Sequence, residues 1–177
     1  STLGDSPEEK LAIELSDGWD REWFLNPLFE KSYPKKILEI LTEAPPVEAG
    51  DFEEISRPLD FLGINYYCRQ TVQPSKDGFP IPIKSINREG VPRTAMGWEI
   101  HPESFEKLLR DVHSRYKPPS IYITENGSAW DDQLINGKIM DPGRISYLQS
   151  HLDAISKART AGVPIDGYFA WSLLDNF

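Results

Sequence analysis

The sequence has few of the residues that build disulfide frameworks, nucleic-acid surfaces or membrane spans. Its 177 residues include one cysteine, Cys68, which excludes an internal disulfide and, with no histidine at motif spacing, predicts an inert buried thiol. There are 28 acidic and 19 basic residues, and the net charge of −9 argues against phosphate binding, since nucleic-acid affinity depends on clustered Lys and Arg. No apolar run approaches the ~18 residues of a membrane span. We therefore expect neither a nucleic-acid nor a membrane partner.

Metal and cofactor motifs are also missing. The sequence contains no cluster of metal ligands, no glycine loop that would cradle phosphate and no nicotinamide fingerprint, so we expect no metal and no cofactor. His101, His113 and His151 lie in or beside helical patterns without ligand spacing, and we expect them on solvated helix faces. The opening STLGDSPEEK lacks the regions of a signal peptide, which together with the single cysteine favours the cytoplasm.

Helical and strand patterns alternate along the chain. Ser6, Pro7 and Glu9 combine an N-cap, a proline at the first helical position and a capping-box glutamate, so a helix should begin there. Apolar residues at helical spacing predict further helices, and short apolar, aromatic-rich runs predict strands. The predicted helices span about residues 6–19, 34–43, 102–116 and 141–162, and the predicted strands span 60–67, 120–124 and 167–174.

The order of these elements predicts an α/β fold with a parallel sheet and right-handed crossovers. We expect the strand at 60–67 to be buried on both faces. Residues 69–97 show no sustained periodicity and should form a long active-site loop. The 177 residues should form one segment without a separate second domain. Three strands alone would leave two exposed sheet edges, which natural proteins usually avoid, so we expect further strands to be missing.

Chemically versatile side chains stand at the end of each predicted strand. Ligands of parallel α/β folds collect at the carboxyl ends of strands, so these side chains should gather at one edge. Together they suit a sugar: polar groups, the amide of Asn126 among them, bind hydroxyls, and an indole packs against the pyranose ring. The residues concerned are Asn65, Tyr66, Tyr67, Glu125, Asn126, Trp171, Asp175 and Asn176.

Each of these residues also has a simpler interpretation. Glu125 could begin a solvated loop, because glutamate is mostly exposed, and the tyrosines and Trp171 could be core residues. A hairpin turn at Asn126–Gly127 is disfavoured, because no alternating partner strand follows at once. The functional interpretation therefore depends on the combination of residues.

Five sequence blocks, in order along the chain, resemble those of a known family. They are WFLNPLFEKSYP (23–34), DFLGINYY (60–67), MGWEI with HPESF after it (96–105), ITENG (123–127) and GYFAWSLLDNF (167–177). The sequence closely resembles glycoside hydrolase family 1, the β-glucosidase family of (β/α)8 barrels, over nearly its whole length. The resemblance implies a portion of a TIM barrel, about the sixth to eighth strand units with their helices.

The resemblance also implies a role for each site residue. Glu125 would be the catalytic nucleophile of a retaining β-glucosidase, Tyr67 would donate a hydrogen bond to it, and Asn65 would lie beside it. Trp171 would lie under the sugar that is cleaved, and Trp98 would line the aglycone side. The substrate would be a β-glucoside, such as a cello-oligosaccharide or an aryl glucoside, and the chemistry needs no cofactor.

The second catalytic carboxyl is not found in the sequence. In the family it lies in an Asn-Glu-Pro motif on the fourth strand, and no such motif occurs here. Nothing in the sequence brings Glu99, Glu103 or Asp131 opposite Glu125, so they are poor substitutes. The resemblance therefore implies an acid/base carboxyl in an N-terminal part outside this chain, and negligible turnover by the chain alone.

Two alternative functions stay open. A 6-phospho-β-glycosidase would share these blocks, although the LLDNF ending resembles the unphosphorylated branch. A non-catalytic sugar-binding or scaffold half-barrel would use its aromatic residues without hydrolysis. Beyond a substrate, the partners to expect are the complementary N-terminal barrel portion and a second copy of the chain joined through exposed strand edges.

Overall fold

A computed structural model describes residues 1–174, and their contacts group into two compact units. The first unit comprises residues 1–58 and 70–89, and the second comprises residues 59–69 and the chain from residue 90 onward. The expected single segment without a separate second domain stays a prediction. Asp175 and Asn176, named above as strand-end residues, lie outside the described residues.

The first unit opens on the predicted helix, α1 (Pro7–Asp17). The capping box is present: Ser6 Oγ accepts from the Glu9 backbone N–H at 3.2 Å, and Glu9 Oε2 accepts from the Ser6 N–H at 3.0 Å. Beyond α1 the chain continues through a π-helical turn (Gly18–Glu22) into α2 (Trp23–Glu30), so the helical run extends well past the predicted end at Trp19. Aromatic packing sustains it, because Trp19 and Trp23 lie 5.8 Å apart between ring centroids.

The remaining elements of the first unit are short. They are α3 (Lys35–Leu38), α4 (Asp51–Ile55) and an antiparallel pair, β2 (Val72–Pro74) and β3 (Ile83–Ser85). The helix predicted at 34–43 is therefore too long: α3 ends at Leu38, well before Pro45 and Pro46, the prolines expected to end it. Residues 69–97 are not wholly loop, because β2 and β3 lie there; strands of three residues are too short to show periodicity.

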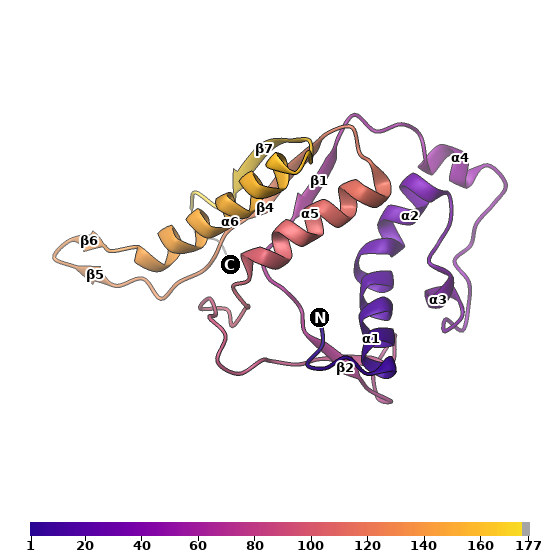
Figure 1. Cartoon of the computed structure of the whole chain (residues 1–177), viewed down its shortest axis with the longest axis horizontal. Coiled ribbons are helices and arrows are strands. Elements are labelled where there is room, and N and C mark those ends of the chain that lie inside the picture. The colour runs from indigo at the N-terminus through magenta and orange to yellow at the C-terminus, as the bar shows by residue number, and fades with distance from the viewer. Residues whose placement is uncertain (175–177) are drawn as a thin grey trace. The chain divides into compact units, whose positions relative to one another are not determined.

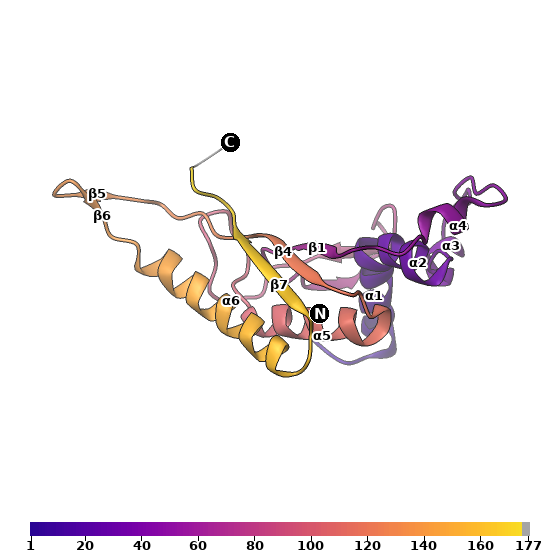
Figure 2. The ribbon, with the colours of Figure 1, turned by 90° about the horizontal axis from the view of Figure 1, so that it is seen from above.

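The second unit contains the predicted parallel sheet. Its strands, β1 (Leu62–Asn65), β4 (Ile121–Asn126) and β7 (Ile165–Ala170), run parallel in the order β1-β4-β7. They lie side by side in Figure 1. Figure 2 shows the two long helices, α5 (Pro102–Tyr116) and α6 (Pro142–Thr160), on one face of this sheet. The predicted alternation of strand and helix is confirmed for these elements.

The sheet is buried on the helix-covered side only. Ile121 and Ile123 of β4 have no exposed surface, and Leu62 and Ile165 of the flanking strands are also buried. On β1, however, Gly63 and Asn65 are exposed. The prediction that this strand is buried on both faces is therefore wrong for the described chain, because helices cover one face and β1 is an edge strand.

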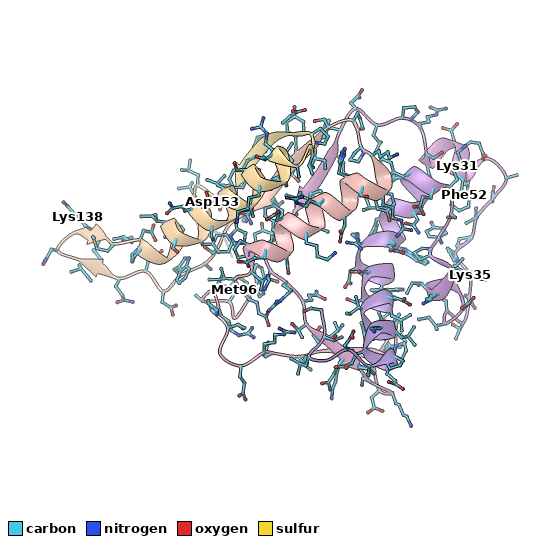
Figure 3. All side chains as sticks on the ribbon, in the orientation of Figure 1. Lys31, Lys35, Phe52, Met96, Lys138 and Asp153 are labelled. Carbon is cyan, nitrogen blue, oxygen red and sulfur yellow. The ribbon has the colours of Figure 1, made fainter. Side chains whose placement is uncertain are left out.

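A small hairpin precedes α6. It consists of β5 (Leu134–Ile135) and β6 (Lys138–Ile139), and Figure 3 labels Lys138 on it. Its two turn residues, Asn136 and Gly137, both have positive φ, at 50° and 73°, as a two-residue type I′ turn requires. The Asn-Gly pair at 136–137 is therefore the hairpin signal in this chain, whereas β4 does not turn into a hairpin at 126–127.

His151 corrects the expectation of solvated histidines. It lies inside α6 with no exposed surface, its Nδ1 is 2.8 Å from the Tyr147 carbonyl oxygen, and its ring stacks on Tyr147 at 3.8 Å between centroids. Nε2 is buried and has no hydrogen-bond partner among the described residues. Burial lowers the pKa of His151, so the fold favours the neutral imidazole.

We expect His151 to make the protein less stable in mild acid. The pKa of His151 is lower in the folded chain than the ordinary value of about 6.5, so as the pH falls the unfolded chain binds the proton first. The contribution of His151 to stability is therefore complete above about pH 6.5 and is lost as the pH falls through the folded pKa. Urea unfolding of the wild type and His151→Gln at pH 7 and pH 5 should show a smaller loss of stability in the variant. Equal losses in the two proteins would contradict this assignment.

Candidate active site

A tyrosine and a glutamate meet at the carboxyl ends of β1 and β4. Tyr67 Oη donates a hydrogen bond to Glu125 Oε2 at 2.7 Å, which is the pair that the sequence predicts. Burial, reinforced by the bond to Glu125 and its negative charge, raises the pKa of Tyr67, so the phenol stays protonated as a donor at neutral pH. The parallel register produces the meeting, since Asn65 of β1 pairs with Glu125 of β4. The catalytic roles of these residues stay predictions.

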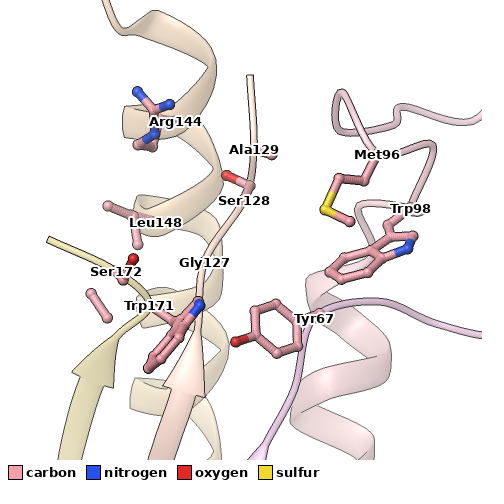
Figure 4. A pocket seen from close by; sticks show the side chains of 11 residues that line it. Tyr67, Met96, Trp98, Gly127, Ser128, Ala129, Arg144, Leu148, Trp171 and Ser172 are labelled. Atoms are coloured by element: carbon pink, nitrogen blue, oxygen red, sulfur yellow. The ribbon is translucent and has the colours of Figure 1, made fainter. Parts of the chain in front are cut away.

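Beside this pair lies a cavity of about 350 Å³ between the loop that carries Trp98 and the end of β7. Figure 4 shows Tyr67 between Trp98 and Trp171. The Tyr67 and Trp98 rings lie 5.3 Å apart between centroids, and Trp171 is 47% exposed, so an indole face is open to a ligand. The lining residues are Tyr67, Met96, Trp98, Gly127, Ser128, Ala129, Arg144, Leu148, Ala170, Trp171 and Ser172.

Gly127 permits the close approach of β4 and β7 at this cavity. A Cβ atom on Gly127 would lie 1.8 Å from the Trp171 carbonyl oxygen, a distance that no side chain can accommodate. The Trp171 N–H donates to the Asn126 carbonyl at 2.9 Å, which holds the two chain segments together. The glycine of the ITENG block is therefore required by the packing of the Trp171 backbone.

The structure buries the side chain of Asn126, which the sequence predicts to bind substrate. It has no exposed surface, and its amide is occupied by protein groups. Asn126 Nδ2 donates to the Tyr66 carbonyl at 2.7 Å and to Tyr147 Oη at 3.0 Å, while Oδ1 accepts from Tyr168 Oη at 2.9 Å. A side chain with these partners in the interior is structural, because a ligand could reach it only by breaking them.

Asn65 remains a candidate at the edge of the site. It is exposed, and its Oδ1 accepts from Thr124 Oγ1 at 2.7 Å. The register of β1 and β4 shifts between Ile64 and Asn65, which brings Asn65 level with Glu125. Its predicted place beside the nucleophile agrees with this backbone register, and its role stays a prediction.

None of the carboxylates considered as substitute acids lines the cavity. Glu99 is 4% exposed and forms ion pairs with Arg69 at 2.7 Å and with Arg93 at 3.3 Å, so its charge is already neutralised. Glu103 is largely exposed beside His101, and Asp131 lines a separate cavity of about 490 Å³. This agrees with the expectation that they are poor substitutes for an acid.

Cys68 is half-buried, and the structure raises the pKa of its thiol, mainly through burial. A thiol that stays protonated is a weak nucleophile, as predicted. Among residues 1–174, no group of three or more metal-ligating side chains could hold a metal ion. In the same part of the chain, no helix is long and apolar enough to cross a membrane.

Sequence reasoning missed several contributors to the site. Ser128, Leu148 and Arg144 line the cavity, and Arg144 forms ion pairs with Asp132, at 2.8 Å, and with Asp141. The Asp141–Arg144 spacing of three residues at a helix start was a usable signal, since such pairs are neighbours on a helix. No local pattern indicated that the chain before the hairpin would fold back on α6.

We expect Glu99 to act in stability. Replacing it by glutamine would remove the carboxylate that forms ion pairs with the partly buried guanidinium groups of Arg69 and Arg93, which should lower the free energy of unfolding by about 3 kcal/mol. The matched control is Glu103→Gln, an exposed position where a change within about 0.5 kcal/mol is expected. Urea denaturation of both variants measures the difference, and equal stabilities would contradict the assignment.

The comparisons with known proteins agree with one another. The sequence pattern of Glycosyl hydrolase family 1 matches residues 2–177. β-Glucosidase A of Thermotoga maritima is 44% identical over 156 residues, which are 87% of this chain and 34% of that relative. A 6-phospho-β-galactosidase of Clostridium acetobutylicum is 31% identical over 201 residues, covering 98% of this chain and 42% of that relative.

The solved family 1 β-glucosidase from Thermotoga maritima superposes on the chain with a TM-score of 0.93 at 39% identity. The superposition covers 100% of this chain and 40% of that one. The same enzyme has been solved in complex with deoxynojirimycin and with glucoimidazole. This chain thus spans between about a third and two fifths of the length of these β-glucosidases. On the match of the family pattern over nearly all its residues, the chain belongs to glycosyl hydrolase family 1.

Proposed function

We propose that this chain supplies the nucleophile side of a retaining β-glucosidase, with Glu125 as the nucleophile. The observation that carries the proposal is the 2.7 Å hydrogen bond from Tyr67 Oη to Glu125 Oε2, beside a cavity lined by Trp98 and Trp171. A carboxylate held by a phenol that itself lines an aromatic pocket suits attack on a bound sugar. The β-glucosidases among its relatives support the substrate class.

The proposed chemistry proceeds in two displacements. Glu125 attacks the anomeric carbon through one carboxylate oxygen, and the glycosidic bond breaks as the leaving oxygen takes the electron pair. Tyr67 holds the other oxygen, Oε2, and thereby fixes the direction of attack. Water then hydrolyses the glycosyl-enzyme, returning Glu125 to its starting state. Trp171 would lie under the cleaved sugar, and Trp98 would contact the aglycone.

Retention needs a second carboxyl group about 5–5.5 Å from the first, to protonate the leaving oxygen and later to activate water. Among the described residues no carboxylate lines the cavity itself, and Glu125 adjoins it through its hydrogen bond to Tyr67. We therefore place the acid/base residue in a part of the barrel outside this chain. The three parallel strands of this chain would be the sixth to eighth strands of the barrel. The chain alone would then have negligible turnover, and the complementary N-terminal portion would be its partner. We further propose a cytoplasmic location and no cofactor.

Covalent trapping tests the nucleophile without needing the acid. A 2-deoxy-2-fluoro-β-glucoside with a dinitrophenolate leaving group loses that group as an anion, so no proton has to be donated. The protein that carries this chain should gain the mass of one fluoroglucosyl group on the peptide containing Glu125. Glu125→Ala should gain none, and Glu103→Ala should label like the wild type. Binding without labelling would support a sugar-binding protein that does not hydrolyse, and would overturn the proposal.

Paired substrates test the choice between β-glucosidase and 6-phospho-β-glycosidase. We expect kcat/KM for an aryl β-glucoside to exceed that for its 6-phosphate by at least about tenfold, because the LLDNF block resembles the unphosphorylated branch, whose site would leave the phosphate charge unpaired. Intact mass should be recorded on the species assayed. A preference for the phosphorylated substrate would assign the protein to the other branch. Glu125-dependent turnover by a verified 177-residue species would show that the acid lies within the chain.

A further inference from the structure

A buried polar network lies directly beneath the candidate nucleophile. Its centre is Asn126, and its other members are the hydroxyl groups of Tyr147 on α6 and Tyr168 on β7. Asn126 has no exposed surface and Tyr147 is 1% exposed, so water does not compete for the hydrogen bond between them. We call Asn126, Tyr147 and Tyr168 the Asn126 network.

The orientation of the amide is fixed by its partners. The Tyr66 carbonyl can only accept, so the group 2.7 Å from it must be the Asn126 NH2. Asn126 Oδ1 then faces Tyr168 Oη at 2.9 Å and accepts from it. Burial raises the pKa of Tyr147 and Tyr168, so both hydroxyls keep their protons at neutral pH.

Tyr147 extends this network to the backbone of the candidate site. Its hydroxyl accepts from Asn126 Nδ2 at 3.0 Å and donates to the Tyr67 carbonyl at 3.1 Å. The network therefore contacts the backbone of Tyr66 and Tyr67. Its central residue, Asn126, directly follows Glu125 in the sequence. A backbone bond from the Tyr66 N–H to the Glu125 carbonyl, at 2.9 Å, completes the connection.

We propose that Tyr147 is a positioning residue, which acts through the Tyr67 backbone to hold the Tyr67 hydroxyl on Glu125. This inference rests on the proposed function. The Tyr67–Glu125 bond joins a side chain just after β1 to one on β4, so its geometry depends on how the strand ends are held. A catalytic group must be held within about 0.5 Å of its productive position, and the network supplies that restraint from within the core.

Tyr168 provides a matched control. Tyr147→Phe and Tyr168→Phe each remove one hydroxyl that bonds to the Asn126 side chain. The hydroxyl of Tyr147 also bonds to the Tyr67 carbonyl, whereas the bonds of Tyr168 go to Asn126 alone. Both variants lose a hydrogen bond to the Asn126 side chain, so the contact with Tyr67 is what Tyr147→Phe removes in addition.

The experiment measures the rate of covalent labelling by the fluoroglucoside probe in the protein that carries this chain. The variants are Tyr147→Phe, Tyr168→Phe, Tyr67→Phe and the double variant Tyr67→Phe/Tyr147→Phe. Tyr147→Phe should label about 3- to 10-fold more slowly than Tyr168→Phe, the range expected for one hydrogen bond. The double variant should label about as slowly as Tyr67→Phe alone, because Tyr147 acts through the hydroxyl that Tyr67→Phe removes.

Two results would overturn the inference. One is that Tyr147→Phe and Tyr168→Phe label at equal rates. The other is that the fold reductions in labelling rate caused by Tyr67→Phe and by Tyr147→Phe multiply in the double variant. Thermal unfolding of each variant measures its stability. If Tyr147 had a purely structural role, Tyr147→Phe would lower the stability, and the reductions in labelling rate would still multiply in the double variant. Failure of the proposed function is distinguishable, because the wild type would then stay unlabelled or labelling would persist in Glu125→Ala; wild-type labelling that is lost in Glu125→Ala but unaffected by Tyr147→Phe would overturn this inference alone.

Discussion

The amide of Asn126 is sealed from water, so its hydrogen bonds must all be made by protein groups. Those groups come from three places: the residue after β1, helix α6 and strand β7. The network can be complete only when all three have assembled around the end of β4. Because Glu125 and Gly127 flank Asn126 in the sequence, the contacts that hold Asn126 in the core also hold the backbone of the candidate site. The arrangement of Tyr67, Glu125 and Trp171 follows from that constraint.

Two glutamates of the second unit, Glu99 and Glu125, have identical side chains but different neighbours. Glu99 is buried between two arginines and anchors a turn in which the Thr94 N–H donates to the Trp98 carbonyl. Glu125 instead meets a neutral phenol and is half-buried beside an open cavity. A carboxylate between two cations is stabilised and a poor reactant, whereas one held by a single neutral donor keeps its charge available for chemistry. The surroundings of Glu99 therefore suit a structural role, and those of Glu125 suit the catalytic role that we propose for it.

The sequence allowed correct prediction of features that are set by local patterns or by the order of parallel strands. The span of α5 was correct at both ends, because a proline at its start and a regular apolar stripe define it. The meeting of Tyr67 with Glu125 followed from the family resemblance and from the rule that parallel strands end at one edge. The sequence could not show that Asn126 is buried, since its partners lie 21 and 42 residues further along the chain. It could not place His151 either, because helical spacing alone does not tell which side of α6 meets α5.

Burial of the Asn126 amide also has a consequence for how the protein can be produced. Residues Asn126, Gly127 and Ser128 form an Asn-x-Ser sequon, the acceptor pattern for N-linked glycans. In the folded chain the acceptor nitrogen is inaccessible and donates two hydrogen bonds, so no transferase can reach it. In a secretory host the enzyme would meet the sequon on the unfolded chain, and a glycan attached there could not enter the core. Expression in a host without N-glycosylation avoids that conflict between modification and folding.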